Sequence, residues 1–220
     1  MPGTTDFRAE REAMIEWQLR RRGIREENIL EAFHAVPREE FVRADARHLA
    51  YGDYPLPIEA GQTVSQPYIV ALMIQAAGVA SGNTVLEVGA GSGYAAAVIG
   101  RIAARVIGIE RHHALVEAAS ERMRRLGYDN VAIVEGDGTR GWPAEAPYDA
   151  ILAAASGSHV PEALIQQLKP GGRIVMPVGD PAGVQTLVKV EKADDGSLSR
   201  SSLCGVRFVP LIGEDGWANG

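Results

Sequence analysis

Cysteine is almost missing from this chain of 220 residues, in which Cys204 is the single example. One cysteine excludes an internal disulfide and any metal site built from several cysteines, and it suits a reducing compartment. Residues 1–17 carry charges where a signal peptide would need an apolar core. We therefore expect a cytoplasmic protein.

Long apolar runs and an excess of positive charge are missing as well. No stretch approaches the ~20 apolar residues that a membrane-spanning helix needs, so we expect no membrane partner. The 28 Asp and Glu outnumber the 22 Lys and Arg, which gives a net charge of -6. No overall positive field therefore attracts nucleic acid. The basic run at residues 20–22 is local, and we interpret it as a solvated helix end.

What the chain does contain is 25 glycines and an alternation of short apolar runs with helical patterns. Val, Ile and Leu runs separated by helices predict a doubly wound α/β fold, in which helices cover both faces of a mostly parallel sheet. The last two strands are joined by a short loop, so we expect an antiparallel hairpin. The expected strands are residues 84–89, 105–110, 131–137, 148–155, 173–179, 184–192 and 202–210, and the helices that follow the first strand are residues 94–103, 113–127 and 161–172.

Two further helical patterns, at residues 7–22 and 27–37, precede this alternation and predict a small helical cap. The length suits one domain, residues 1–220. We expect it to consist of the cap, a ligand-binding core and C-terminal strands, at residues 1–60, 61–180 and 181–220.

The sequence EVGAGSGY, residues 87–94, follows the first expected strand and opens a helix. Ligands of such sheets bind at the carboxyl ends of the strands. A dinucleotide site requires the spacing G-x-G-x-x-G, but here Gly89, Gly91 and Gly93 are followed by Tyr94 in the third position. A glycine loop alone is weak evidence, because turns need glycine anyway.

Acidic residues at the ends of three successive strands strengthen this evidence. Glu87, Glu110 and Asp137 would each be read alone as solvated loop residues, but together they favour a nucleoside site. Glu110 lies where a carboxylate accepts both ribose hydroxyls, and Asp137 lies where it can meet an amino-purine edge. The pattern resembles the class I methyltransferases, which implies a Rossmann-like sheet and S-adenosyl-L-methionine as the cofactor.

The stretch AGQTVSQPYIVALM, residues 60–73, narrows this resemblance. Together with residues 87–98, 134–143, 168–179 and 206–213, it closely resembles the protein-L-isoaspartate O-methyltransferase family. The resemblance covers nearly the whole chain. It implies a monomeric cytosolic enzyme that methylates L-isoaspartyl residues in damaged proteins and thereby initiates their repair through a succinimide.

The resemblance also implies site residues, with no metal among them. Ser65 would be catalytic. The implied cofactor-binding residues are Gln66, Glu87, Gly89, Gly91, Glu110, Asp137 and Gly138. The implied substrate-binding residues are Thr63, Ser65, Tyr68 and Val206.

Ser65 has two interpretations on chemical grounds. A carboxylate substrate is already ionised at neutral pH, so it needs orientation by a hydroxyl and no general base. Alternatively, Ser65 or Thr63 serves the turn or caps the helix that begins near Pro67.

Some alternatives stay open. The family tends to have a proline-containing stretch after the fourth strand, but this chain has AAASGSHVP, residues 153–161, in which we expect His159 to be a surface loop residue. Other hypotheses are a methyltransferase for a small-molecule carboxylate or nucleic acid, and a cofactor-binding module without catalytic activity.

Overall fold

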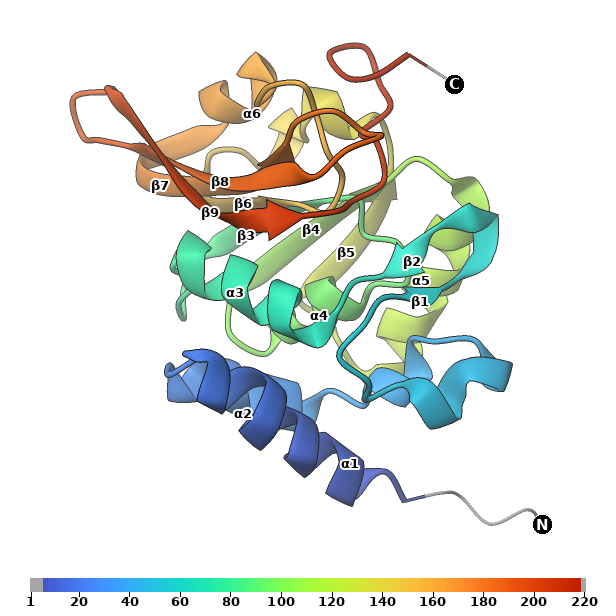
Figure 1. The fold of residues 1–220 in the computed structure, drawn as a ribbon. Helices are drawn as coiled ribbons and strands as arrows, with labels where there is room; N and C mark the ends of the chain where they lie inside the picture. The colour runs from blue at the N-terminus through green and yellow to red at the C-terminus, as the bar shows by residue number, and fades with distance from the viewer. Residues whose placement is uncertain (1–5, 219–220) are drawn as a thin grey trace.

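The computed structural model describes residues 6–218, so residues 1–5 and 219–220 of the expected domain lie outside the described part. A seven-stranded sheet with the order β5-β4-β3-β6-β7-β8-β9 forms its centre (Figure 1). Strands β3 to β7 run parallel and β8 and β9 antiparallel, which confirms the expected sheet. The strands are β3 (Thr84–Val88), β4 (Arg105–Glu110), β5 (Val131–Glu135), β6 (Tyr148–Ala153), β7 (Leu168–Val178), β8 (Gln185–Lys192) and β9 (Leu198–Val206).

The two faces of the sheet are buried against different layers. Val85 and Val106 pack in one cluster with the helices at residues 67–77, 94–100 and 113–126, whereas Leu86 and Ile107 pack in another with Leu211 and the short helix at residues 162–166. This alternation is what a strand buried on both faces requires. No helix within residues 6–218 has the length and apolar character needed to cross a membrane. The helices on the sheet are α3 (Pro67–Ala77), α4 (Tyr94–Gly100), α5 (His113–Leu126) and α6 (Glu162–Gln166).

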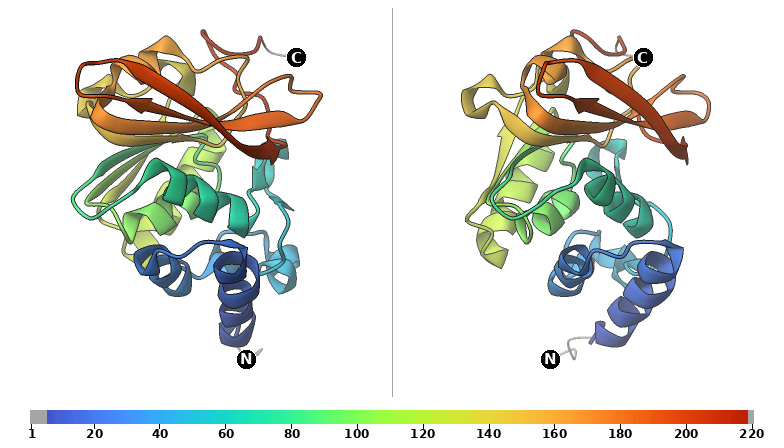
Figure 2. Two further views of the ribbon diagram at one scale, coloured as in Figure 1. Left: turned by 60° about the vertical axis from the view of Figure 1, so that its left-hand side comes forward. Right: turned by 90° about the vertical axis from the view of Figure 1, so that its left-hand side faces the viewer.

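The expected helical cap packs on α3 and α4. Figure 2 shows its helices on the side of α3 and α4 that faces away from the sheet. Phe33 and Phe41 of the cap make edge contacts with Tyr94 of α4. The cap contains α1 (Arg8–Ala13), which continues in wider turns to Leu19 and a tight turn to Arg22, then α2 (Glu27–Ala35), 3-10 turns at Arg38–Glu40 and Ala44–Leu49, and a small hairpin of β1 (Leu56–Pro57) with β2 (Thr63–Val64).

Several sequence-predicted bounds are wrong, and for two of them the structure shows the cause. The helix expected over residues 161–172 ends at Gln166, because Pro170 cannot continue it and the Gln167 side chain instead bonds the backbone of Trp142 and Arg140. The last strand, expected over residues 202–210, ends at Val206. Beyond it, the Phe208 amide donates to the Gln185 side chain, which turns the chain out of the sheet.

Candidate active site

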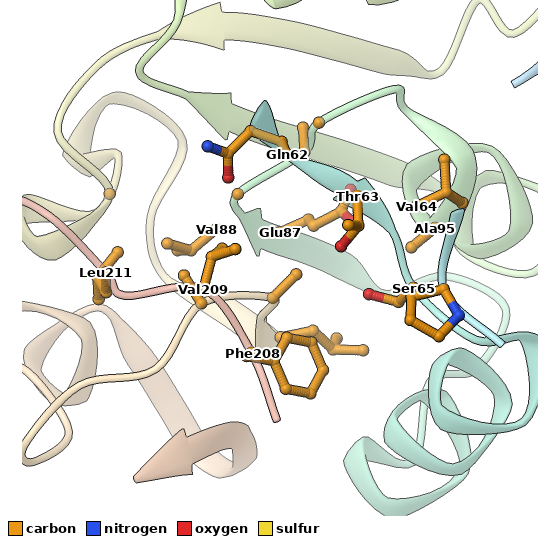
Figure 3. A pocket seen from close by; sticks show the side chains of 18 of the residues that line it. Gln62, Thr63, Val64, Ser65, Glu87, Val88, Ala95, Phe208, Val209 and Leu211 are labelled. Atoms are coloured by element: carbon orange, nitrogen blue, oxygen red, sulfur yellow. The ribbon is translucent and has the colours of Figure 1, made fainter. Parts of the chain in front are cut away.

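A cavity of about 980 Å³ opens at the carboxyl ends of β3, β4 and β6. Its walls come from segments that are distant in the sequence: the β1–β2 hairpin, α3, the loop before α4 and the chain after β9 (Figure 3). Strand order reverses at this point of the sheet, since β4 lies on one side of β3 and β6 on the other. This is the place where open α/β sheets bind ligands.

The glycine loop lines the cavity, and it has a backbone conformation that only glycine adopts readily. Gly89, Gly91 and Gly93 have φ of 84°, 54° and 83°, in the left-handed region that disfavours side chains. The amides of Gly89 and Ala90 both donate to the carbonyl of Ile109 at 2.8 and 2.9 Å. The loop is thereby fixed against β4, and Gly89 and Gly91 line the cavity as the sequence predicts.

Glu110, at the end of β4, is held by three backbone amides. Its Oε2 accepts from Gly91 at 3.0 Å, and its Oε1 accepts from Arg111 and His112 at 2.8 and 2.9 Å. The side chain is 5% exposed and lines the cavity. The carboxylate therefore stands at a fixed position beside the glycine loop.

Glu87, at the end of β3, is a buried carboxyl group without a complete set of partners. It is 2% exposed, and its Oε2 has no hydrogen-bond partner among the described residues. Burial first, and then the negative charge of Glu110, raise the pKa of Glu87 to about 8. A cationic group in the cavity beside Glu87 would supply the missing partner and favour its ionised form.

Asp137 lies differently from the other two acids. Gly138 lines the cavity, but the Asp137 side chain does not. Its Oδ1 accepts from the amide and hydroxyl of Thr139, and its Oδ2 accepts from the Glu214 amide at 2.8 Å. Burial alone would raise the pKa of Asp137, but these hydrogen bonds lower it. Its carboxylate thus connects the loop after β5 to the C-terminal segment.

Ser65 lies on the opposite side of the cavity, between the β1–β2 hairpin and α3. Figure 3 shows its hydroxyl pointing into the pocket, on the side where Phe208 lies. The residue before α3 is Gln66, and the amide nitrogen of its side chain donates to the Asp53 carbonyl. No side chain within residues 6–218 caps this helix, so the capping interpretation of Ser65 and Thr63 is not supported.

The remaining predicted substrate residues do not all reach the cavity. Thr63, Gln66 and Val206 line it together with Ser65. Tyr68 does not, because its ring packs against the guanidinium of Arg22 at 3.5 Å.

Comparison with known proteins shows the family. The family model described as Protein-L-isoaspartate(D-aspartate) O-methyltransferase (PCMT) matches residues 9–216. The chain belongs to this family. The resemblance expected from the stretch at residues 60–73 is thereby confirmed.

Relatives of this methyltransferase family match over most of the chain. Protein-L-isoaspartate O-methyltransferase 2 of Pelobacter propionicus is 52% identical over 207 residues, which cover 94% of this chain and 92% of the relative. A solved protein-L-isoaspartate O-methyltransferase is 34% identical with a TM-score of 0.85, covering 94% of this chain and 67% of its own. A Plasmodium falciparum structure, described as the same type of enzyme in complex with S-adenosyl-L-homocysteine, is 26% identical with a TM-score of 0.78, covering 95% and 99%.

Several residues that line the methyltransferase cavity are not predicted by the sequence. Ile69 and Met73 project from α3 into the lining. Their i, i+4 spacing places them on one helix face, but the sequence does not distinguish a face toward a cavity from one toward the core. Leu211 and Ile212 form part of the wall beyond β9.

His159, where the chain departs from the family pattern, is exposed as expected and does not line the cavity. Its ring nitrogens lie 2.9 Å from the Ser158 hydroxyl and 3.0 Å from Asp215. The departure therefore affects how the C-terminal segment is attached.

Proposed function

We propose that this chain transfers a methyl group from S-adenosyl-L-methionine to the free carboxylate of L-isoaspartyl residues in damaged proteins and peptides. The main observation behind this proposal is that the two ends of the cavity carry different chemical groups. Two buried carboxyl groups and a glycine loop form one end, and Ser65 stands at the other among mostly neutral and apolar groups, with Arg207 as the charged residue. Family membership supports the same reaction.

The residues of the glycine-loop end fit this cofactor. S-adenosyl-L-methionine, when bound, supplies a methyl group on a positively charged sulfur and also carries an amino group. Glu87, with an unpartnered buried oxygen, would ionise beside such a cation and provide its negative counterpart. Glu110 would accept ribose hydroxyls from its fixed position, and Gly89, Gly91 and Gly138 let the ligand approach the backbone closely.

At the other end of the cavity, the chain has to orient the substrate carboxylate. A carboxylate with a pKa of about 4 is already a nucleophile at neutral pH, so no general base is required. The Ser65 hydroxyl donates a hydrogen bond to one carboxylate oxygen and leaves the second oxygen to attack. A neutral donor withdraws less electron density from the attacking group than an arginine would, and good orientation contributes roughly 7 to 11 kcal/mol in favourable cases.

The product explains why methylation suffices to start repair. A methyl ester can expel methanol, whereas a carboxylate has no comparable leaving group. The neighbouring backbone nitrogen therefore attacks the ester carbonyl, its proton leaves with the methoxide as methanol, and a succinimide forms. Hydrolysis of this ring returns part of the material to normal aspartate. No further step requires this chain.

The finer assignments are also proposals. We propose that Gln66 and Asp137 serve the cofactor side and that Thr63 and Val206 serve the peptide side. Tyr68 would serve the peptide side only from outside the cavity lining, where its ring packs on Arg22, and the chain would act as a single monomeric domain in the cytoplasm. The lone cysteine and the net charge of -6 support a cytoplasmic enzyme with no nucleic acid or membrane partner.

Methyl transfer to matched peptides tests the function. We expect labelled methyl groups to pass from S-adenosyl-L-methionine to a peptide with one L-isoaspartyl residue. The same peptide with normal aspartate is expected to stay unlabelled. Equal labelling of both peptides, or none of either, would contradict the proposal.

A further inference from the structure

Arg38 is a buried cation that the reaction described above does not use. It lies in the cap, on the 3-10 turn Arg38–Glu40, and is 0% exposed. Its Nε donates to the Ala50 carbonyl at 2.7 Å, and one terminal nitrogen donates to the Ser65 carbonyl at 2.9 Å. The other terminal nitrogen has no partner among the described residues.

A charge in this position is costly to the folded protein. Within residues 6–218, no carboxylate forms an ion pair with Arg38, and the guanidinium instead lies 4.5 Å from the centre of the Tyr94 ring. Burying a charge without an ion-pair partner is unfavourable, and the two hydrogen bonds to carbonyls offset only part of that cost. The position of Arg38 therefore points to a role outside stability.

That role is indicated by the backbone that Arg38 holds. Ser65 lies between β2, which ends at Val64, and α3, which begins at Pro67. Its carbonyl thus falls outside both regular elements, and Arg38 is its donor in the described part of the chain. Fixing this carbonyl restrains the peptide plane that follows Ser65, and thereby helps to hold the Cα atom from which the Ser65 side chain projects.

A second arginine holds the other end of the cavity in a similar way. Arg122 of α5 donates to the Glu40 carbonyl in the cap and to the Ser92 carbonyl in the glycine loop, each at 2.7 Å. Residues 38–40 of the cap are thus tied by one arginine to Ser65 and by another to the glycine loop. Arg122 provides a matched comparison for Arg38.

We propose that Arg38 is a positioning residue for the methyl transfer: it orients Ser65 through its carbonyl and places a positive charge behind the site of the substrate carboxylate. This inference rests on the proposed function. Because Arg38 lies behind Ser65 and does not line the cavity, its charge attracts the carboxylate without clamping the attacking oxygen. It therefore avoids the loss of nucleophilicity that a direct contact with arginine would cause.

The test compares Arg38→Met and Arg38→Lys with Arg122→Met. For each variant, kcat and KM are measured with an isoaspartyl peptide, and the Kd for S-adenosyl-L-methionine is measured by calorimetry. Arg38→Met is expected to lower kcat about 100-fold, the loss that misplacement of a reacting group produces, with the cofactor Kd unchanged. Arg38→Lys, which keeps the charge but not the two-pronged bond, should recover part of this activity.

Arg122→Met should show the opposite pattern, with the cofactor Kd raised about tenfold, as loss of a charge-assisted hydrogen bond predicts. If Arg38→Met does not fold, Arg38→Lys provides the test. We expect its kcat to fall about tenfold while its Kd for S-adenosyl-L-methionine stays unchanged. Wild-type kcat in the Arg38 variants, or equal losses of kcat and cofactor affinity, would overturn the proposal. Wild-type protein that methylates no isoaspartyl peptide, yet binds the cofactor, would overturn the proposed function and this role with it.

Discussion

The two ends of the cavity differ in charge and in how their groups are held. After their proposed roles, we call residues 87–93 and 110–112 the cofactor end and residues 62–66 and 205–209 the peptide end. The cofactor end carries two buried carboxyl groups, of which Glu110 is held by three backbone amides, together with Arg111 and His112. The peptide end presents hydroxyls, amides and apolar side chains, with Arg207 as its charged residue.

This difference follows from what each end has to do. A cation is best held by negative groups whose positions are fixed before binding, because no reorganisation is then needed. An anion that must also react is better held by neutral donors, since a close cation would stabilise the ground state as much as the transition state. In our proposal Arg38 adds a positive charge behind the cavity wall, besides Arg207 in the wall itself.

The largest expected effect concerns Glu87 at the cofactor end. Its pKa lies at about 8 instead of 4.5, so the folded protein binds this proton more tightly than the unfolded chain. The stabilising contribution is complete below pH about 4.5 and is lost as the pH rises through about 8, with a total of roughly 4 to 5 kcal/mol. Glu87→Gln should remove this dependence, measured as the free energy of unfolding in urea between pH 6 and 9.

Glu31→Gln serves as the control for this experiment, because Glu31 is exposed on α2. Its profile should run parallel to that of the wild type. A Glu87→Gln profile that also runs parallel would show that the buried group is ionised throughout, and the contrast between the two ends would then be smaller than we describe.

The next effect concerns Ser65 at the peptide end. Ser65→Ala removes the hydroxyl that we propose orients the carboxylate, and the loss of a hydrogen bond to a charged group predicts a fall in kcat of about 10- to 100-fold. The Kd for S-adenosyl-L-methionine should not change, because the cofactor end is left intact. Ser158→Ala, whose hydroxyl lies outside the cavity next to His159, is the control. Wild-type turnover by Ser65→Ala would leave this residue with a structural role only.

The sequence predicts the cofactor end better than the peptide end, for a physical reason. Strand periodicity places Glu87 and Glu110 at strand ends, and parallel strands bring their carboxyl ends to one edge of the sheet. The glycine spacing then predicts the loop between them. Each step uses local pattern and a general rule of topology.

The peptide end depends on contacts that no local pattern contains. Arg38 stands in the charged stretch PREE, which reads as surface, yet its side chain is completely buried under Ser65. The exit of the chain after Val206 is decided by the side chain of Gln185 on the neighbouring strand. Ser65 itself was found through the family resemblance, because its residue type alone also suits a helix cap.

The smallest expected effect concerns Asp137, which marks the boundary of the cofactor end. Its carboxylate holds the Glu214 amide, and the C-terminal segment places Leu211 and Ile212 in the cavity wall. Asp137→Ala should therefore weaken cofactor binding only about threefold, as loss of part of a hydrogen-bond network predicts, and should speed hydrogen exchange at the Glu214 amide. Asp137→Asn should have a cofactor affinity and an exchange rate between those of the wild type and Asp137→Ala, because one acceptor oxygen remains.

If affinity falls while exchange at Glu214 stays slow, Asp137 contacts the cofactor directly, and the three strand-end acids form one group. If both change together, Asp137 acts through the C-terminal segment, and the cofactor end contains two acids whose positions are fixed by the sheet.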